Sequence, residues 1–493
     1  MSTWVKWLLS IVGVIVLLLV GVAVTVRVQM GPLNFPPLSG ALEPEILQQQ
    51  LMLPPNFTIG TYATGVAGAR NLLFTPSGDL LVSVPGDGRI VLLSADDDGD
   101  GHADSERQLM SGLSHPSGMA IREGYLYIGE THQIGRIQYD AEAGQLAGEY
   151  EVVVPGLPRG GNHPKKIIGF GPDDRLYVAI GSTCNVCIEE DERRATMMRF
   201  SPDGQDGEIV ARGLRSSVGF AWDLDGTLYA TDNGRDALGD DYPPCELNEV
   251  VVGGHYGWPF VNGFGDPDPD YGDDDSQPAQ TVAPVHGFRA HTAPLGISFI
   301  QGEKFPEAYR GVALVALHGS WNRSERDGYS LVSLHWQNDG SIEERDLVAG
   351  FVGEDETVYG RPADVKEGPD GAIYFSDDFT GTIYRVAYGE PQSLLATSRP
   401  TTASGLDPEV TLAKFSPDER KRLAEVGQNI FEADQCARCH EAKPGNKVLK
   451  DIGQRYDLVS LGQLLQKPPP PMPLLPYTDD DRRALSVYLI ETY

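Results

Sequence analysis

The sequence predicts an all-β six-bladed propeller followed by a small all-α domain, with a transmembrane helix in front of both. Between residues 56 and 388 a turn of Asp, Gly or Pro followed by an apolar strand recurs about every 50 residues, a period typical of propeller blades. After residue 412 the apolar residues change to helical spacing. Near the amino terminus, Trp7 to Val26 form an uncharged, mostly apolar run long enough to cross a bilayer.

Residues 1–27 are predicted to be a membrane anchor, and the proline-rich residues 28–55 a tether. A cleaved signal peptide would have a shorter apolar region and a cleavage site of small residues. Val22 to Met30 offers no good site of this kind, so a retained anchor is favoured. With Lys6 on the cytoplasmic side, the body of the protein is expected in the periplasm of a bacterium, attached to the inner membrane.

The propeller is expected to span residues 56–388. The gap before its last repeat holds two more candidate strands, beginning at Leu295 and Gly311, and an acidic insertion around Asp266 to Asp275, which brings the count to six blades. A β-sandwich is the alternative, but a sandwich does not require a repeat of this length. The recognisable repeats begin at Pro76, Arg122, Pro172, Leu224 and Pro369.

Residues 389–411, rich in Pro, Ser and Thr, are expected to be a linker, and residues 412–493 a small helical domain. Ser416-Pro-Asp-Glu419 predicts the start of a helix, with a capping box and Pro at the first helical position. Thr478-Asp-Asp-Asp481 predicts a second start of the same kind. The two helices would lie on either side of the segment from Cys436 to Met472.

Cys436-Ala-Arg-Cys439-His440 predicts covalent attachment of a c-type haem. Two thiols one turn apart can each add to a haem vinyl group, while the next imidazole binds iron. Met472, the only methionine after His440, is the expected sixth ligand, and a gap-filling core Met is the alternative. The segment that contains Met472 and the last helix resembles class I cytochromes c. That resemblance implies an electron carrier without an open coordination position on iron.

The three cysteines outside the haem motif can also be assigned from the sequence, and the net charge of the chain excludes one class of partner. Cys184 and Cys187 form another C-x-x-C pair, but Ile188 follows where haem attachment would need His. A local disulfide is favoured over a redox-active pair, and Cys245 is left as a free thiol. The net charge of -31, from 70 acidic and 39 basic residues, argues against nucleic acid as a partner.

Seven short segments between about Pro54 and Tyr388 resemble the pyrroloquinoline quinone (PQQ) dependent sugar dehydrogenases, especially the L-sorbosone and pyranose dehydrogenase branch. They occur in the order in which this family has them. The segments are Gly161-Asn-His-Pro, Gly181-Ser-Thr-Cys-Asn-Val-Cys187, Gly213-Leu-Arg-Ser-Ser-Val-Gly219, Thr231-Asp-Asn-Gly-Arg-Asp236, Gly254-His-Tyr-Gly-Trp-Pro259, His318-Gly-Ser-Trp-Asn-Arg323 and Gly360-Arg-Pro-Ala-Asp-Val365.

The resemblance implies roles for particular residues. His163 corresponds to the base that takes the proton of the substrate hydroxyl, a task that suits a neutral imidazole near pH 7. Arg215 corresponds to an arginine near the quinone oxygens, where a fixed positive charge would stabilise the reduced cofactor. Ser216 stands where glucose-oxidising relatives have Asn, so this chain departs from them at one cofactor contact.

The resemblance also implies contacts with the cofactor carboxylates and with calcium. Arg361 corresponds to a carboxylate partner, and either His318 or Arg323 would replace the family's cofactor lysine. The alternative is that His318 and Arg323 are structural polar residues of a loop between blades. Gly234 and Arg235 stand where backbone carbonyl oxygens bind a calcium ion, a hard cation that prefers oxygen ligands.

A separate acidic loop can be identified from its residues alone, without the family resemblance. Its alternating carboxylates and its Gly at the sharp turn suit a calcium loop, although Arg107 stands at the twelfth position, where an EF-hand has Glu. A solvated acidic turn is an equally good interpretation. The four candidate ligands are Asp96, Asp98, Asp100 and Asp104.

Together these features predict a membrane-anchored enzyme that oxidises a sugar or a related alcohol or aldehyde with PQQ and calcium. Electrons would pass through the covalent haem c to a respiratory acceptor. Two alternatives stay open: a calcium-dependent hydrolase of the lactonase type, because a fold alone does not specify chemistry, and a non-catalytic propeller that docks the cytochrome to a partner.

Overall fold

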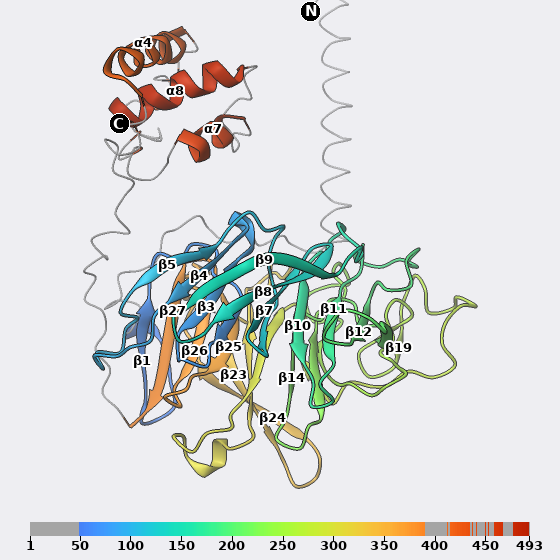
Figure 1. Cartoon of the computed structure of the whole chain (residues 1–493). Helices are drawn as coiled ribbons and strands as arrows, with labels where there is room; N and C mark the ends of the chain where they lie inside the picture. The colour runs from blue at the N-terminus through green and yellow to red at the C-terminus, as the bar shows by residue number, and fades with distance from the viewer. Residues whose placement is uncertain are drawn as a thin grey trace, which may run out of the picture. The chain divides into compact units, whose positions relative to one another are not determined.

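The computed structural model describes residues 49–389, 415–433, 458–466 and 477–492, together with Leu412, Cys436, His440, Leu449 and Ile452. The chain divides into two compact units, Met1–Ala396 and Thr397–Tyr493. The first unit is a β-propeller and the second is helical, and Figure 1 shows the elements of both.

The propeller consists of six blades, each with four antiparallel strands, which we number in chain order. Blade 1 contains β2 (Leu72–Phe74), β3 (Leu80–Val84), β4 (Arg89–Leu93) and β5 (Glu106–Met110). Blade 2 contains β6 (Met119–Arg122), β7 (Tyr125–Glu130), β8 (Gln133–Asp140) and β9 (Gln145–Val154). Blade 3 contains β10 (Lys166–Phe170), β11 (Leu176–Ile180), β12 (Thr196–Phe200) and β13 (Glu208–Arg212).

The other three blades have the same plan. Blade 4 contains β14 (Gly219–Trp222), β15 (Leu228–Asp232), β16 (Cys245–Glu249) and β20 (His286–Phe288). Blade 5 contains β21 (Pro294–Phe299), β22 (Ala313–Leu317), β23 (Ser330–Trp336) and β24 (Ile342–Val348). Blade 6 contains β25 (Pro362–Glu367), β26 (Ile373–Asp377), β27 (Thr382–Tyr388) and β1 (Phe57–Ala63).

The first strands of the blades form a closed ring. They contact one another in the order β2, β6, β10, β14, β21 and β25, and β25 contacts β2 again. Blade 6 completes the circle with strands from both ends of the propeller sequence, because β1 pairs antiparallel with β27 from Phe57 opposite Tyr388 onward. Ring closure of this kind leaves no long sheet edge exposed. The predicted six-bladed propeller is therefore confirmed.

The recurring sequence motif corresponds to one hairpin of each blade. In the turn before the second strand, Gly78, Gly226 and Gly371 have φ values of 95°, 82° and 77°, which glycine adopts without steric cost. The strands that follow, such as β3 and β11, are buried along their whole length because blades pack on both faces. Burial on both faces explains why these strands read as nearly continuous apolar runs.

Blade 4 carries the acidic insertion between β16 and β20. The insertion contains β18 (Val261–Asn262) and β19 (Asp266–Pro267), which form a small hairpin, and β17 (Gly254–His255), which pairs parallel with β13 of blade 3. The insertion therefore extends from its own blade to the neighbouring one. A short 3-10 helix lies in blade 1 (Pro85–Asp87) and another in blade 5 (Glu307–Tyr309).

The helical unit contains α4 (Pro417–Ala433), α7 (Leu458–Gln466) and α8 (Asp479–Thr492). Both predicted helix starts are present: Ser416 Oγ accepts the Glu419 N–H at 3.3 Å, and Thr478 Oγ1 accepts the Asp481 N–H at 3.2 Å. Helices α4 and α8 cross closely at Gly427, where a Cβ atom would lie 2.2 Å from the Ala484 carbonyl oxygen. Their apolar faces form a core that includes Phe431, Leu461 and Leu485.

Within the described ranges, no helix is both long and apolar enough to cross a membrane. The predicted anchor, residues 1–27, lies outside the described residues, as does most of the predicted tether.

Candidate functional site

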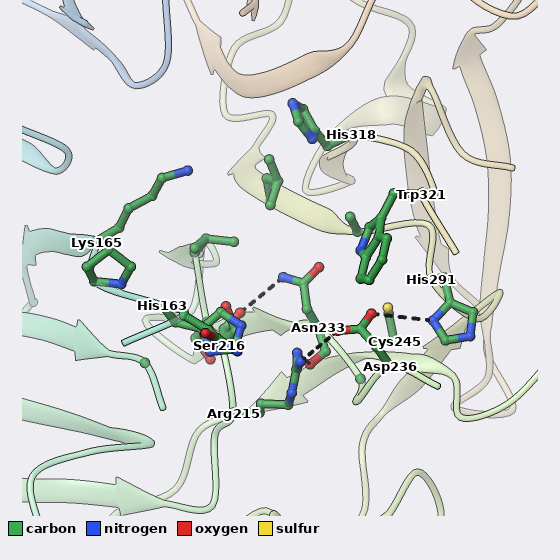
Figure 2. Close-up of a pocket in the computed structure, with 18 of the residues that line it drawn as sticks. His163, Lys165, Arg215, Ser216, Asn233, Asp236, Cys245, His291, His318 and Trp321 are labelled. Carbon is green, nitrogen blue, oxygen red and sulfur yellow. Dashed lines mark hydrogen bonds and ion pairs between the residues drawn. The ribbon is translucent and has the colours of Figure 1, made fainter. Parts of the chain in front are cut away.

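A cavity of about 360 Å³ opens at one end of the propeller, a size typical of small-molecule sites. The loop before the first strand of a blade and the loop after its second strand meet at this end, because the two strands run antiparallel. These loops supply the lining, part of which Figure 2 shows. Its polar and aromatic members include Arg70, His163, Lys165, Arg215, Ser216, Asn233, Asp236, His291, His318 and Trp321.

His163 lies just before β10, and its hydrogen bonds determine which ring nitrogen carries the proton. The Ser182 hydroxyl donates its single hydrogen to the Cys184 carbonyl oxygen at 2.7 Å. Ser182 Oγ can therefore only accept at His163 Nδ1, 2.8 Å away, and the Ser182 carbonyl oxygen, at 3.2 Å, also only accepts. The proton is thus on Nδ1, and the lone pair on Nε2 is available to take a proton.

The surroundings of His163 keep the imidazole neutral. Burial, followed by the nearby charge of Arg215, lowers the pKa of His163 from 6.5 to about 3. At physiological pH the ring is therefore neutral and its Nε2 is unprotonated. The role of His163 as the base stays a prediction.

Arg215 lies before β14 and is almost completely buried. Its Nε donates to the Asn185 carbonyl oxygen at 2.9 Å, and Nη1 donates to the Asn233 carbonyl oxygen at 3.0 Å. Its Nη2 donates to Asn185 Oδ1 at 2.7 Å and to Asp236 Oδ2 at 3.1 Å. Of the five N–H groups of a guanidinium, the described residues thus engage four, which leaves one for a group bound in the cavity.

A buried carboxylate supports the loop that carries Arg215. Asp232, at the end of β15, accepts the backbone N–H of Arg215 at 2.8 Å and that of Ser216 at 2.5 Å. Burial raises the pKa of Asp232 to about 7, against the opposing effect of these hydrogen bonds. Asp232 therefore acts as a structural clamp beneath the cavity.

One wall of the cavity is rich in cations. Arg70, before β2, forms an ion pair with Asp378, and His318 Nε2 lies 2.8 Å from Asp378 Oδ1. Burial, followed by the charge of Arg70, lowers the pKa of Lys165 to about 7. Burial also lowers the pKa of His318 to about 3, which leaves this ring neutral. The wall thus carries more positive than negative charge and suits an acidic ligand.

The other two predicted carboxylate partners take different positions. Arg361 lies behind His318, where its Nε donates to the His318 carbonyl oxygen at 3.1 Å and its guanidinium stacks over the ring of Tyr329. Arg323 does not line the cavity. Its guanidinium instead donates to the Asp240 carbonyl oxygen and to Asp241 Oδ1, and so connects two loops. Of the two residues proposed to replace the family's lysine, the structure places only His318 at the cavity.

Gly234 lines the cavity, and the side chain of the next residue points into the protein. Arg235 donates through Nη1 to both carboxylate oxygens of Asp268 at 2.7 Å and through Nη2 to Asp270 at 2.9 Å. Both Arg235 and Asp268 are buried, so this pair attaches the acidic insertion to the loop after β15. The carbonyl oxygens of this loop are hard donors, the type that calcium prefers.

The acidic loop of blade 1 lies after β4, apart from the residues that line the cavity. Ligand oxygens of Asp96, Asp98 and Asp104 lie within 4.8 Å of one another, whereas Asp100 does not belong to this group. Asp96 accepts three backbone N–H groups of its own loop, from Gly99, Asp100 and Gly101. The predicted calcium loop stays a prediction.

The cysteines divide as predicted in the propeller. Cys184 and Cys187 form a disulfide, and Cys245 is a buried free thiol whose pKa burial raises to about 11. In the helical unit Cys436 packs against the core, and its carbonyl oxygen accepts the His440 N–H at 3.1 Å. A bond from residue i+4 to residue i has the spacing of an α-helical hydrogen bond. Cys439 and Met472 lie outside the described residues.

A family profile described as "Glucose / Sorbosone dehydrogenase" matches residues 125–385, which is just over half of the 493-residue chain. The chain belongs to the glucose/sorbosone dehydrogenase family. The matched range contains His163, Arg215 and His318. The expected relationship of the propeller to these sugar dehydrogenases is thereby confirmed.

A protein of Borreliella burgdorferi named as uncharacterized is 37% identical over 222 residues, which cover 44% of this chain and 58% of that protein. The holo form of the pyranose dehydrogenase PQQ domain from Coprinopsis cinerea has a similar fold, with a TM-score of 0.58, 19% identity and coverage of 69% of this chain and 97% of that one. The calcium structure of Trichoderma reesei carbohydrate-active enzyme family AA12 also has a TM-score of 0.58, with 20% identity and coverage of 69% and 97%. At 19% and 20% sequence identity, the similarity to these two structures shows a shared fold.

Sequence reasoning missed several residues that the structure brings to the site. Arg70 and Lys165 line the cavity, and Asp378 and Asn185 bind its arginines. The position within the sequence repeat could have identified some of these residues. Asp378 and Asn233 each follow the second strand of a blade. Polar residues at that repeat position meet at the cavity whatever the family.

Proposed function

We propose that this protein is a PQQ-dependent dehydrogenase that oxidises a sugar or a related alcohol or aldehyde. The observation that carries the proposal is the pairing of a neutral His163, with an available Nε2 lone pair, and a charged Arg215 in one cavity. A proton acceptor next to a fixed cation is what oxidation of a hydroxyl group requires.

His163 would accept the hydroxyl proton of the substrate at Nε2. The proton on Nδ1 would stay in its hydrogen bonds to Ser182, so the imidazole would not need to turn during the reaction. Arg215 would stabilise negative charge that develops nearby, since its position is fixed by Asn185, Asn233 and Asp236. PQQ, when bound, would supply the quinone that takes up the two electrons of the oxidation.

The cavity wall supports an acidic quinone as the cofactor. Arg70 and Lys165 would bind its carboxylates, and His318 would contribute a neutral polar edge. Arg361 would act from behind through its charge, which already lowers the pKa of Lys165. The carbonyl oxygens of Gly234 and Arg235 would hold calcium, as the donor chemistry of this loop permits.

We further propose that the helical unit carries haem c on Cys436 and Cys439, with His440 and Met472 as iron ligands. The support is the C-x-x-C-H motif and the hydrogen bond from the His440 N–H to the Cys436 carbonyl oxygen. Electrons from the cavity would then leave through the haem to a respiratory acceptor. The apolar run from Trp7 to Val26 would keep the protein at the inner membrane, with its body in the periplasm.

A reconstitution assay tests the proposed activity. Purified full-length protein is mixed with PQQ and Ca²⁺, and a panel of sugars, alcohols and aldehydes is screened with an artificial electron-accepting dye. We expect dye reduction with at least one sugar-like substrate, and none when PQQ is left out. Lactone hydrolysis in place of dye reduction, or no turnover with any substrate, would contradict the proposal.

The haem proposal has its own test. Because thioether bonds are covalent, haem should stay with the polypeptide through acidic organic extraction, and it should be lost when both Cys436 and Cys439 are replaced by Ser. Haem that is extracted from the wild-type protein would show that it is not bound in this way.

A further inference from the structure

The loop between β11 and β12 contains a turn, Cys184–Cys187, which a disulfide closes and which contacts the cavity loops. Asn185 is inside the ring that this disulfide closes. Its side chain contacts Arg215 and the backbone of Asp236, and its carbonyl oxygen contacts Arg215 and Trp258. The turn therefore connects blade 3 with the neighbouring blade at the site.

Asn185 contacts Arg215 and Asp236 at the same time. Its Oδ1 accepts from Arg215 Nη2 at 2.7 Å and from the Asp236 backbone N–H at 2.8 Å, while its Nδ2 donates to the Asp236 carbonyl oxygen at 3.0 Å. Its own carbonyl oxygen accepts from Arg215 Nε at 2.9 Å and from the indole N–H of Trp258 at 3.1 Å. One residue thus satisfies two of the Arg215 donors and holds the backbone that carries Asp236.

The same turn also reaches His163. The Cys184 carbonyl oxygen accepts the hydrogen of Ser182 Oγ, and this bond is the reason that Ser182 can only accept from His163 Nδ1. If Cys184 moved away, Ser182 could donate to Nδ1 instead, and the proton of a neutral imidazole would shift to Nε2. The position of the turn therefore affects both the tautomer of His163 and the placement of Arg215.

We propose that Asn185 is a positioning residue of this site, and that the Cys184–Cys187 disulfide holds it in place, so that reduction of the disulfide impairs the site. The part of this inference that concerns sugar oxidation rests on the proposed function. The part that concerns Arg215 does not, since it follows from hydrogen bonds in the protein alone.

Reduction changes the turn in a defined way. Dithiothreitol is oxidised to its cyclic disulfide, and the bond between Cys184 and Cys187 takes up two electrons and two protons to give two thiols. The ring then opens, and the turn gains conformational freedom. Asn185 would spend less time at Arg215, and the guanidinium would become accessible to reagents.

The experiment compares Asn185→Ala with Asn185→Asp, which keeps an acceptor for Arg215 and for the Asp236 N–H and loses only the donor to the Asp236 carbonyl oxygen. Val186→Ala is the matched control, because Val186 lies in the same disulfide-closed turn. Cys184→Ser combined with Cys187→Ser reproduces the open ring without reductant. Modification of Arg215 by phenylglyoxal, followed by peptide mass spectrometry, reports its accessibility without any need for activity or cofactor.

We expect Arg215 to be modified about tenfold faster in Asn185→Ala, in the double Cys variant and in the reduced wild-type protein than in the oxidised wild-type protein. Asn185→Asp and Val186→Ala should react like the wild type. In the dye assay, kcat should fall by about 100-fold in Asn185→Ala, as expected for a misplaced catalytic group, and Asn185→Asp should recover most of it.

Equal Arg215 reactivity in all proteins would overturn the inference. A faster Arg215 reaction combined with no sugar oxidation by the wild type would refute the proposed function and leave the positioning role intact. If Asn185→Ala does not fold, reduction of the folded wild-type protein provides the same comparison.

Discussion

At the scale of single residues, the site combines groups whose charge states are set by burial. His163 and His318 are neutral because burial lowers the pKa of both rings to about 3. Burial lowers the pKa of Lys165 to about 7. The cavity therefore combines a neutral imidazole, the guanidinium groups of Arg70 and Arg215, and one amine whose charge depends on pH.

Lys165 makes cofactor binding depend on pH. Below pH 7 its side chain is charged and attracts an acidic quinone, and above pH 7 this charge is lost. The dissociation constant for PQQ, measured by fluorescence titration, should therefore increase by about tenfold as the pH rises from 6 to 8, and Lys165→Met should remove this dependence. An unchanged pH dependence in the Met variant would assign the effect to another group.

His163 also affects stability. The unfolded chain takes up a proton at His163 near pH 6.5, whereas the folded chain resists this until about pH 3. Because the unfolded state binds more protons in this window, the contribution of His163 to stability is lost as the pH falls from 6.5 toward 3. As the pH falls from 7 to 4, the unfolding free energy of His163→Asn should therefore rise relative to that of the wild type. Urea titrations at several pH values would measure this difference. Parallel curves for the two proteins would contradict this.

At the scale of elements, each blade hairpin joins strands that are adjacent in the sequence, whereas ring closure joins strands from the two ends of the propeller sequence. The closing strand β1 pairs with β27, and Ile59 on β1 is buried in the core between blades. Ile59→Ala should lower the unfolding free energy by about 2–5 kcal/mol, the cost of a large-to-small change in a core. The exposed Met52→Ala serves as the control. A loss no larger than in the control would show that β1 does not close the ring in solution.

This difference between local and distant contacts explains what could be predicted. The turn-and-strand repeat follows from local turn chemistry, so five blade hairpins and the strands from Leu295 and Gly311 were recognisable in the sequence. The contact between Arg235 and Asp268, which attaches the acidic insertion, could not be recognised in the sequence because these residues are far apart in it. Similarly, His163, Arg215 and His318 carry family motifs, whereas Arg70 and Asp378 meet only because blades 1 and 6 are neighbours in the closed ring.

At the scale of the whole molecule, the propeller and the helical unit share one chain. If the helical unit carries haem and residues 389–411 act as the linker that their composition predicts, this linker would hold the haem at an effective concentration on the order of millimolar relative to the propeller. The rate of haem reduction after mixing with substrate should then be independent of protein concentration in stopped-flow absorbance. Cutting the chain between residues 389 and 411 should make the same rate depend on concentration. A rate that already increases with protein concentration in the intact chain would show transfer between molecules.

The most direct test of the central claim, that this cavity oxidises a sugar-like substrate with His163 as the base, is a single-turnover measurement. Protein loaded with PQQ and Ca²⁺ is mixed with substrate at pH 7, and reduction of the quinone is followed by its absorbance. His163→Asn is compared with the wild type, and His286→Asn, on the outer strand of blade 4, is the control.

We predict that His163→Asn keeps the cofactor but reduces it about 100-fold more slowly, the usual contribution of a positioned base, and that His286→Asn matches the wild type. Reduction at the wild-type rate in His163→Asn would contradict the account.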